Sequence, residues 1–433
     1  MGLGEVRVQR LDHAELGRRE RVAPRRAEGL VLQRHGHGNQ AFLNTGLAFT
    51  VDDVAYLTGD DGRLALDELA GYAFTDASRV ADVATARKRF GDRAPVLVET
   101  TLLRRKAKAK VADSDGWLFT DEALQQATAG PVAEHRAHRL AGAVVHDVTC
   151  SIGAELAALR DSTSLVVGSD LDPVRLAMAG NNVPGVALCR ADALQPVTRD
   201  AVVVADPARR TAGRRRFDPR DYTPALDRLF EVYGHRDMVV KCAPGVDFDQ
   251  LTRIGFAGEV EVTSLAGSVR EACLWTRGLA SSTVSRRATI LDRGEEVTDA
   301  DADDCTVGAA GRWIVDPDGA VVRAGLVRNY GARHGLWQLD PAIAYLSGDE
   351  LPAGVRGFEV IEQVDFRERV LRQAVSAHDA GALEILVRGV DVDPDVLRAR
   401  LRPRGSQRLA LVVTRIGAGS ASRSVAYVCR PSR

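Results

Sequence analysis

Acidic residues follow short apolar segments in a fixed order through the middle of the chain. Asp147 ends the first segment, Asp170 ends the second, Asp192 follows the third, and Asp206 ends the fourth. A carboxylate after the second segment can accept hydrogen bonds from both hydroxyls of a ribose, and one after the third can accept a hydrogen bond from the exocyclic amine of adenine. The small residues that lead from Asp147 to Gly153 let a backbone approach a ligand and open a helix N-terminus toward it. This order predicts a site for an adenosine-containing molecule.

A parallel sheet is the element that can bring these carboxylates together. Most of the apolar segments are followed by helical sequence, and they lie at residues 143–148, 164–168, 186–189, 201–205 and 238–242. This alternation predicts a parallel α/β sheet with helices on both faces. Ligands of such sheets bind at the carboxyl ends of the strands. Two further strands, at residues 259–265 and 270–276, flank a short link and are predicted to form an antiparallel hairpin.

The same residues resemble class I S-adenosylmethionine-dependent methyltransferases, over about residues 141–295. The resemblance implies a Rossmann-like seven-stranded sheet and S-adenosylmethionine as the cofactor. It implies that Asp147 and Gly153 hold the methionine side of the cofactor, Asp170 its ribose and Asp192 its adenine, with Asp206 beside the transferable methyl group. The 23-residue spacing from Asp147 to Asp170 agrees with the roughly 20 residues expected across a strand–helix–strand unit.

The turn after Asp147 departs from the pattern of this family. Thr149 and Ser151 stand where the family usually has glycines, and Gly153 remains. We include Thr149 among the expected cofactor-binding residues because the turn is still built of small residues. A nicotinamide-dependent enzyme of the same fold is the competing interpretation, but it needs a G-x-G-x-x-G turn that this chain lacks here.

A narrower resemblance covers most of residues 95–430. The motifs that carry it include Asp206-Pro207-Ala208-Arg209-Arg210, Val240-Lys241-Cys242-Ala243-Pro244-Gly245, Glu271-Ala272-Cys273-Leu274-Trp275 and Gly335-Leu336-Trp337-Gln338-Leu339-Asp340. They resemble a bacterial methyltransferase family with a C-terminal THUMP-like domain. The resemblance implies Asp206, Pro207, Arg209 and Lys241 as catalytic residues. Because THUMP domains proper bind RNA, it also implies structured RNA, tRNA or rRNA, as the partner.

Arginines cluster directly after the predicted catalytic loop. Arg209, Arg210, Arg214 and Arg215 stand where a substrate phosphate is expected, and guanidinium groups bind phosphate through paired donors. We therefore expect Arg210, Arg214 and Arg215 to bind the substrate. The alternative for Arg209 is an internal ion pair with an acid of the next helix.

Two further stretches are rich in basic residues. Residues 104–110 carry five positive charges, and residues 396–433 contain nine arginines and no acid. Each is consistent with contact to an RNA backbone. The alternatives are a solvated helix face for the first stretch and arginine-rich codon usage of a GC-rich genome for the second.

The motifs leave open which atom accepts the methyl group. Related amino methyltransferases hold an exocyclic amine with an Asp-Pro-Pro-aromatic loop, whereas this chain has Ala208 and Arg209 at the last two positions. An arginine plane can stack on a base, so direct transfer to a nucleobase is our main expectation. A second hypothesis is a C5-pyrimidine methyltransferase in which Cys242, beside Lys241, adds to the base as a nucleophile. A third is a non-catalytic RNA- or protein-binding module on a decayed methyltransferase fold.

Composition narrows the class of protein. The 433 residues are 45% apolar and 27% charged with a net charge of -1, which excludes a uniformly basic nucleic-acid binder and an acidic disordered chain. The sequence contains no run of about 18 apolar residues, the length that a membrane-spanning helix needs, so we expect no membrane partner. Six cysteines without a CxxC pair predict a reduced, cytoplasmic protein that binds no metal. We expect a monomer.

Changes of pattern along the chain predict its organisation. We expect a flexible extension over residues 1–40 and a helical domain over 41–140. The methyltransferase domain is expected over residues 141–298, and a mixed α/β THUMP-like domain over 305–433 after an acidic linker.

Overall fold

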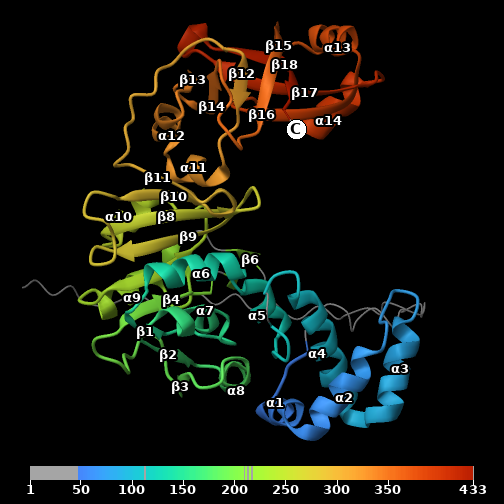
Figure 1. Cartoon of the computed structure of the whole chain (residues 1–433), viewed down its shortest axis with the longest axis vertical. Coiled ribbons are helices and arrows are strands. Elements are labelled where there is room, and N and C mark those ends of the chain that lie inside the picture. Colours follow the sequence, from blue (N-terminus) through green and yellow to red (C-terminus); the bar gives the residue numbers. More distant parts are fainter. Residues whose placement is uncertain (1–46, 112–113, 209, 212–213, 216–217, 433) are drawn as a thin grey trace, which may run out of the picture. The chain divides into compact units, whose positions relative to one another are not determined.

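A computed structural model describes residues 47–432, apart from residues 112–113, 209, 212–213 and 216–217 (Figure 1). For Arg210, Thr211, Arg214 and Arg215 it describes the backbone alone. The extension predicted over residues 1–40 therefore lies outside the described residues.

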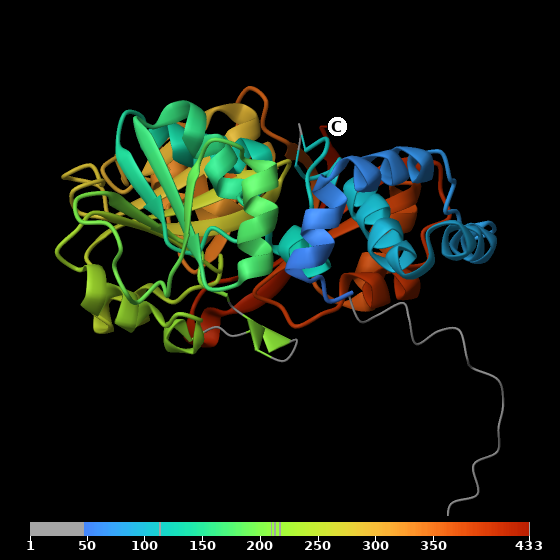
Figure 2. The same ribbon diagram turned by 90° about the horizontal axis from the view of Figure 1, so that it is seen from below.

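Helices fill the described chain before the first strand. They are α1 (Val51–Thr58), α2 (Asp60–Ala70), α3 (Arg79–Phe90), α4 (Ala94–Ala107), α5 (Asp121–Gln126) and α6 (Gly130–Arg139), with a 3-10 turn at Gly91–Arg93. Thr120 caps α5, because its side chain accepts a hydrogen bond from the backbone N–H of Ala123. Helices α1 to α4 gather side by side (Figure 2).

The first sheet has nine strands in the order β11-β10-β8-β9-β7-β4-β1-β2-β3. The strands are β1 (Val144–Asp147), β2 (Leu165–Asp170), β3 (Ala187–Arg190), β4 (Val202–Ala205), β7 (Met238–Cys242), β8 (Gly258–Leu265), β9 (Ser268–Thr276), β10 (Arg286–Ile290) and β11 (Glu295–Thr298). Seven of them, β8 to β3 in that order, form the predicted Rossmann-like sheet, and β8 and β9 pair antiparallel as expected. Strands β10 and β11 are additions that the sequence analysis missed, because their charged residues hide an apolar pattern. Two-residue strands β5 (Arg210–Thr211) and β6 (Arg214–Arg215) pair only with each other.

Helices cover both faces of this sheet. Helix α6 lies on one face with α7 (Ala154–Ser162) and α8 (Pro173–Asn182). The other face is covered by α9 (Leu226–Tyr233), α10 (Phe248–Arg253) and α11 (Gly319–Ala324), with a 3-10 turn at Pro219–Asp221 before α9. Alternate residues of β7 therefore face opposite sides: Val239 packs with the first group of helices, and Val240 and Cys242 pack with the second.

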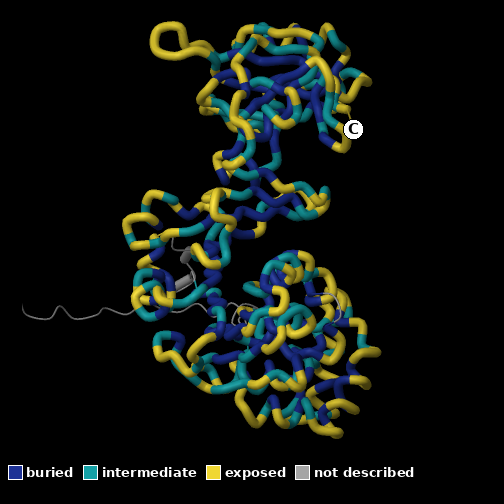
Figure 3. Tube along the Cα trace, turned by 60° about the vertical axis from the view of Figure 1, so that its left-hand side comes forward, coloured by how far each residue is buried: buried dark blue, intermediate teal, exposed yellow. Residues whose placement is uncertain are grey.

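The C-terminal part is built on a second sheet with the strand order β13-β14-β12-β15-β18-β17-β16. Its strands are β12 (Trp313–Val315), β13 (Trp337–Asp340), β14 (Ile343–Gly348), β15 (Gly357–Asp365), β16 (Ala380–Arg388), β17 (Gln407–Ile416) and β18 (Arg423–Pro431). Its other helices are α12 (Val327–Arg333), α13 (Glu368–Ala377) and α14 (Pro394–Leu401), and 3-10 turns lie at Leu291–Arg293 and Gly419–Ala421. Buried residues run along the strands of both sheets (Figure 3).

Ion pairs fix α6 to the first sheet. Arg139 bonds Glu259 and Glu261 on β8, at 2.8 and 2.6 Å. Burial raises the pKa of Glu261, but the hydrogen bond from His135 and the charge of Arg139 outweigh it and bring the pKa to about 2. These bonds hold the C-terminal end of α6 against the first half of β8.

No helix in the described ranges is both long enough and apolar enough to cross a membrane.

Candidate functional site

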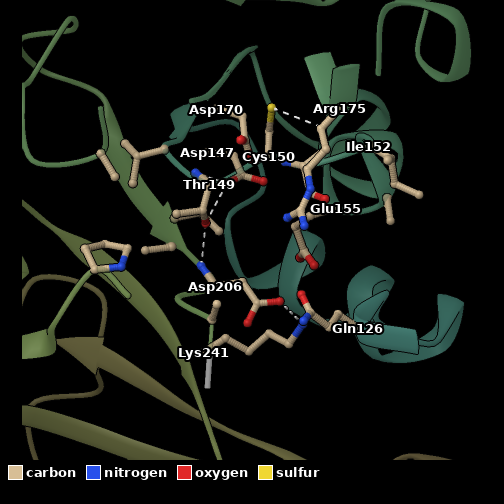
Figure 4. A pocket seen from close by; sticks show the side chains of 18 of the residues that line it. Gln126, Asp147, Thr149, Cys150, Ile152, Glu155, Asp170, Arg175, Asp206 and Lys241 are labelled. Carbon is tan, nitrogen blue, oxygen red and sulfur yellow. Dashed lines mark hydrogen bonds and ion pairs between the residues drawn. The ribbon is translucent and has the colours of Figure 1, made fainter. Parts of the chain in front are cut away.

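A cavity of about 440 Å³ opens at the carboxyl ends of β1 and β4. The strand order reverses between these two strands, which is where open α/β sheets bind their ligands. Asp147, Asp170, Asp192 and Asp206 all line the cavity, so the structure brings the four predicted carboxylates together. Figure 4 shows Asp170 toward one end of the pocket and Asp206 with Lys241 toward the other.

The turn after β1 explains why threonine replaces a family glycine. The Thr149 side-chain Oγ1 accepts a hydrogen bond of 2.7 Å from the backbone N–H of Asp206. The Thr149 backbone N–H donates at 3.0 Å to Asp147 Oδ1. A glycine at this position could not make the first bond, so Thr149 joins the turn after β1 to the loop after β4.

Replacing Thr149 should uncouple these two loops. We expect Thr149→Val to leave the Asp206 N–H without its acceptor and to cost about 1–3 kcal/mol of unfolding free energy, measured by urea denaturation. Thr149→Ser keeps the hydroxyl and should stay within about 1 kcal/mol of the wild type. Equal losses in the two variants would contradict the role of the hydroxyl.

Gly153 is required by its backbone and by its surroundings. It precedes α7 in the left-handed region, with φ +85°. A Cβ at this position would lie 2.8 Å from Val183 Cγ2. Glycine is the residue that combines this conformation with such close packing, and it opens the N-terminus of α7 beside the cavity.

Backbone N–H groups hold the acids at the far end of the cavity. Asp170 accepts from Ser151 N at 3.0 Å and from Asp172 N at 2.9 Å. Asp192 accepts from Leu194 N at 2.9 Å. These bonds fix the carboxylates in place and leave them lining the cavity, where ribose hydroxyls and an adenine amine could reach them.

A buried lysine defines the opposite end. Lys241 Nζ donates to Asp206 Oδ2 at 2.5 Å and to Thr128 Oγ1 at 2.7 Å. Burial lowers the pKa of Lys241, but the charges of Asp206, Glu271 and Glu155 outweigh it and the net pKa is raised, so the lysine stays charged. Within the described part of the chain, Asp206 Oδ1 makes no hydrogen bond and is left for a ligand.

An arginine that the sequence analysis missed lies near this end. Arg136 on α6 is 2% exposed, and its Nε donates to Glu155 at 3.0 Å and its Nη1 to Glu271 at 2.6 Å. Its buried Nη2 makes no hydrogen bond among the described residues. Arg136 lies in an ordinary amphipathic helix pattern with no motif around it, so its position could not be found before the fold was known.

Two carboxyls in the cavity have raised pKa values. Burial, together with the charges of Glu155, Asp206 and Asp170, raises the pKa of Asp147 to about 8, although the Thr149 N–H lowers it. Burial also raises the pKa of Glu155, against the lowering effect of Arg136 and Lys241. Such carboxyls favour a cationic ligand, because a positive charge stabilises their ionised form.

The cavity fits S-adenosylmethionine. Its volume lies within the roughly 300–1,000 Å³ of small-molecule sites. Carboxylates suited to ribose and adenine line one end. The other end offers the free Nη2 of Arg136 and the carboxyls of Asp147 and Glu155, which suit a zwitterionic amino acid.

A second cavity of about 910 Å³ adjoins the first. Both are lined by Gln126, Ala127, Thr128, Asp206, Ala208 and Lys241. Pro207, predicted as catalytic, lines the second cavity. The Asp206–Lys241 pair is thus part of the wall shared by two cavities.

The structure tests the remaining site predictions unevenly. Arg209 lies outside the described residues, and the side chains of Arg210, Arg214 and Arg215 are not described, so their substrate contacts stay predictions. Cys242 is 0% exposed, packs on the face opposite Lys241 and lines neither cavity, which argues against its role as a nucleophile.

The first three cations of the basic run over residues 104–110 have partners within the chain. Arg104 and Arg105 donate to backbone carbonyls, including those of Trp117 and Ala73, and Lys106 pairs with Asp121 at 2.7 Å. Arg105 and Lys106 are nevertheless exposed, as the expectation of a solvated helix face requires. Arg104 and Lys106 tie α4 to the segments around α5, and Arg105 ties it to the end of α2.

Comparisons with known proteins show which family the chain belongs to. Two S-adenosylmethionine-dependent methyltransferases, from two strains of Mycobacterium tuberculosis, are each 67% identical over 357 residues, which is 80% of this chain and 100% of theirs. The crystal structure of a Porphyromonas gingivalis protein described as a methyltransferase has the same fold, with a TM-score of 0.64 and 16% identity. The match covers 88% of this chain and 98% of that one.

Two domain families match parts of the chain. The THUMP domain-like family matches residues 355–431, and a domain family of unknown function matches residues 50–107. Together with the relatives that match along their whole length, the cavity and its carboxylates lead to one conclusion: this chain belongs to the S-adenosylmethionine-dependent methyltransferases.

Proposed function

We propose that the enzyme methylates a nucleobase of structured RNA, tRNA or rRNA, by direct transfer. The observation that carries the proposal is that Asp206 and Lys241 line both the first cavity and a second, larger one. The first cavity takes the cofactor, and the second takes the acceptor.

The cofactor residues follow from the two ends of the first cavity. Asp170 and Asp192 bind the ribose and the adenine, and Arg136 with Asp147 and Glu155 faces the methionine end. S-adenosylmethionine supplies an electrophilic methyl group on a positively charged sulfur. The Asp206–Lys241 end of the cavity then lies next to the acceptor space.

Asp206 and Lys241 orient the acceptor. Asp206 Oδ1 accepts a hydrogen bond from an N–H of the base and aims the nitrogen lone pair toward the first cavity. Lys241 donates to the other carboxylate oxygen of Asp206 and to the Thr128 hydroxyl, and these two bonds hold the lysine and the carboxylate in place. Positioning of this kind supplies most of the rate enhancement of a simple displacement.

RNA as the partner is supported by the C-terminal part. The THUMP domain-like match covers β15 to β18. Arg402 and Arg404 between α14 and β17, and Arg408 at the start of β17, are exposed and have no ion pair among the described residues. Unpaired arginines on one loop suit the phosphates of a nucleic acid. We propose that residues 305–433 dock RNA while residues 141–298 modify it, with residues 41–140 completing the acceptor cavity.

Nucleoside mass spectrometry of rRNA and tRNA from a deletion strain tests the proposal. We expect one methylated nucleoside to disappear, to return with the wild-type gene, and to stay missing with Asp206→Asn. An unchanged nucleoside profile in the deletion strain, or full restoration by Asp206→Asn, would contradict it.

A further inference from the structure

Four cations line the second cavity, and the described residues give none of them a close ion pair with an acid of that cavity. Lys108 and Lys110 follow α4, Arg270 lies on β9, and Arg323 lies on α11. The acids that line the same cavity are already paired: Asp206 with Lys241, and Glu271 with Arg136. The cavity therefore carries an excess of positive charge.

The surroundings of these cations leave that charge available. Lys110 Nζ donates to the carbonyls of Leu124 and Gln125, and Arg270 donates to the carbonyl of Leu265, all neutral partners.

The other two cations are freer still. Lys108 lies 3.9 Å from Asp115, and both side chains are more than 70% exposed, so this pair is weak. Arg323 is exposed and has no ion pair within the described ranges.

Electrostatics at Lys110 report the same excess. Burial lowers the pKa of Lys110, and the positive charges of Lys241, Lys106 and Arg270 lower it further, against a smaller opposite effect of Asp206. A site that disfavours one more positive charge in this way favours an anion. The first residues of α6, Ala129 to Pro131, also line the cavity, and no side chain caps that helix.

We propose that Lys108, Lys110, Arg270 and Arg323 form a phosphate collar that binds the RNA backbone next to the nucleotide whose base enters the second cavity. This inference rests on the proposed function, because it places the acceptor base at Asp206. The cations come from three separate elements around a cavity of about 910 Å³. Cations contributed by three elements around a cavity of this size suit several phosphates of a strand.

The test uses the two collar residues whose side chains are exposed and free of backbone bonds. Binding of a fluorescent, mixed-sequence single-stranded 12-nucleotide RNA is measured by anisotropy at several salt concentrations, with the full chain. We expect Lys108→Gln/Arg323→Gln to weaken binding about tenfold at low salt and to reduce the slope of log K against log salt by about 1.4, since each phosphate contact contributes roughly 0.7. The Kd for S-adenosylmethionine, measured by calorimetry, should stay unchanged.

A matched control removes the same charge elsewhere. Arg63→Gln/Lys88→Gln changes exposed cations on α2 and α3 that line neither cavity. We expect this variant to change RNA affinity less than twofold. Equal weakening by both double variants, or an unchanged salt slope in the collar variant, would overturn the proposal.

Two further comparisons distinguish an RNA phosphate from a free anion, and the collar proposal from the methylation proposal. Inorganic phosphate at equal total phosphate should compete poorly with the labelled RNA, and equal competition would overturn the collar in favour of a free-anion site. The assay measures RNA binding without methyl transfer. A collar variant that binds RNA normally would therefore overturn the collar and leave the nucleoside test of the proposed function unaffected. Loss of the nucleoside result with normal collar binding would instead overturn the methylation proposal alone.

Discussion

Replacing Asp206 by asparagine should slow methyl transfer by about a thousandfold while the Kd for S-adenosylmethionine changes less than about threefold. In the proposed function the carboxylate orients the acceptor, whereas Asp170 and Asp192, the residues proposed for ribose and adenine, line another part of the first cavity. Single-turnover rates with RNA from the deletion strain give the first quantity, and calorimetry gives the second. A variant that keeps more than about a tenth of the rate would contradict the role assigned to Asp206.

Replacing Lys241, the ion-pair partner of Asp206, should also slow methyl transfer. Lys241→Met removes the group that holds Asp206 Oδ2, so its loss of rate should approach that of Asp206→Asn. Since the two side chains act as one unit, the double variant should lose no more than the worse single variant. Fully additive losses would show that the two residues act separately. Thermal unfolding of each variant checks that the buried neighbours Glu155 and Glu271 still allow folding.

Cys242→Ala is the matched control beside Lys241. The Cys242 side chain packs among α9 to α11, on the other face of β7. We expect its rate to stay within about twofold of the wild type. A loss as large as that of Asp206→Asn would revive the covalent C5 hypothesis.

Binding of S-adenosylmethionine should strengthen as the pH rises from 6 to 8. Burial raises the pKa of Asp147 to about 8, so the empty cavity holds this carboxyl mostly protonated at neutral pH. A cationic ligand favours the ionised form. Binding below pH 8 therefore releases a proton, and the Kd should fall by up to about tenfold per pH unit. Above pH 8 the carboxyl is already ionised and this dependence should level off.

Calorimetry in buffers of different ionisation enthalpy measures that proton release directly. Glu155, Asp206, Asp170 and the Thr149 N–H are the groups that set the pKa of Asp147, and all remain in the control variant Asp147→Asn. The amino group of the ligand titrates equally with both proteins, so the difference between them isolates Asp147. A pH profile shared by the wild type and Asp147→Asn would contradict the prediction.

Local sequence signals were enough for much of the methyltransferase sheet. Short apolar segments ended by acids predicted β1, β2, β3, β4 and β7, because a buried parallel strand must be apolar along its length. The charged strands β10 and β11 and the short strands β12 to β14 escaped this reasoning. Such strands are held by pairing with neighbours that are distant in sequence, and no local pattern records that pairing.

The sequence by itself indicated a site for an adenosine-containing molecule, since the order of Asp147, Asp170, Asp192 and Asp206 along successive strands places them at one edge of a parallel sheet, and its resemblance to a methyltransferase family implied S-adenosylmethionine. It also determined Gly153, whose conformation excludes a side chain.

Only the tertiary structure decided which charges are available for function. It paired Lys241 with Asp206, buried Arg136 between two glutamates, and gave Arg104 and Lys106 partners on segments remote in the chain. It also brought Lys110, Arg270 and Arg323 around one cavity from three distant segments. Whether a charged side chain is neutralised or free depends on partners that are remote in the chain, and the folding of the chain alone brings those partners within reach.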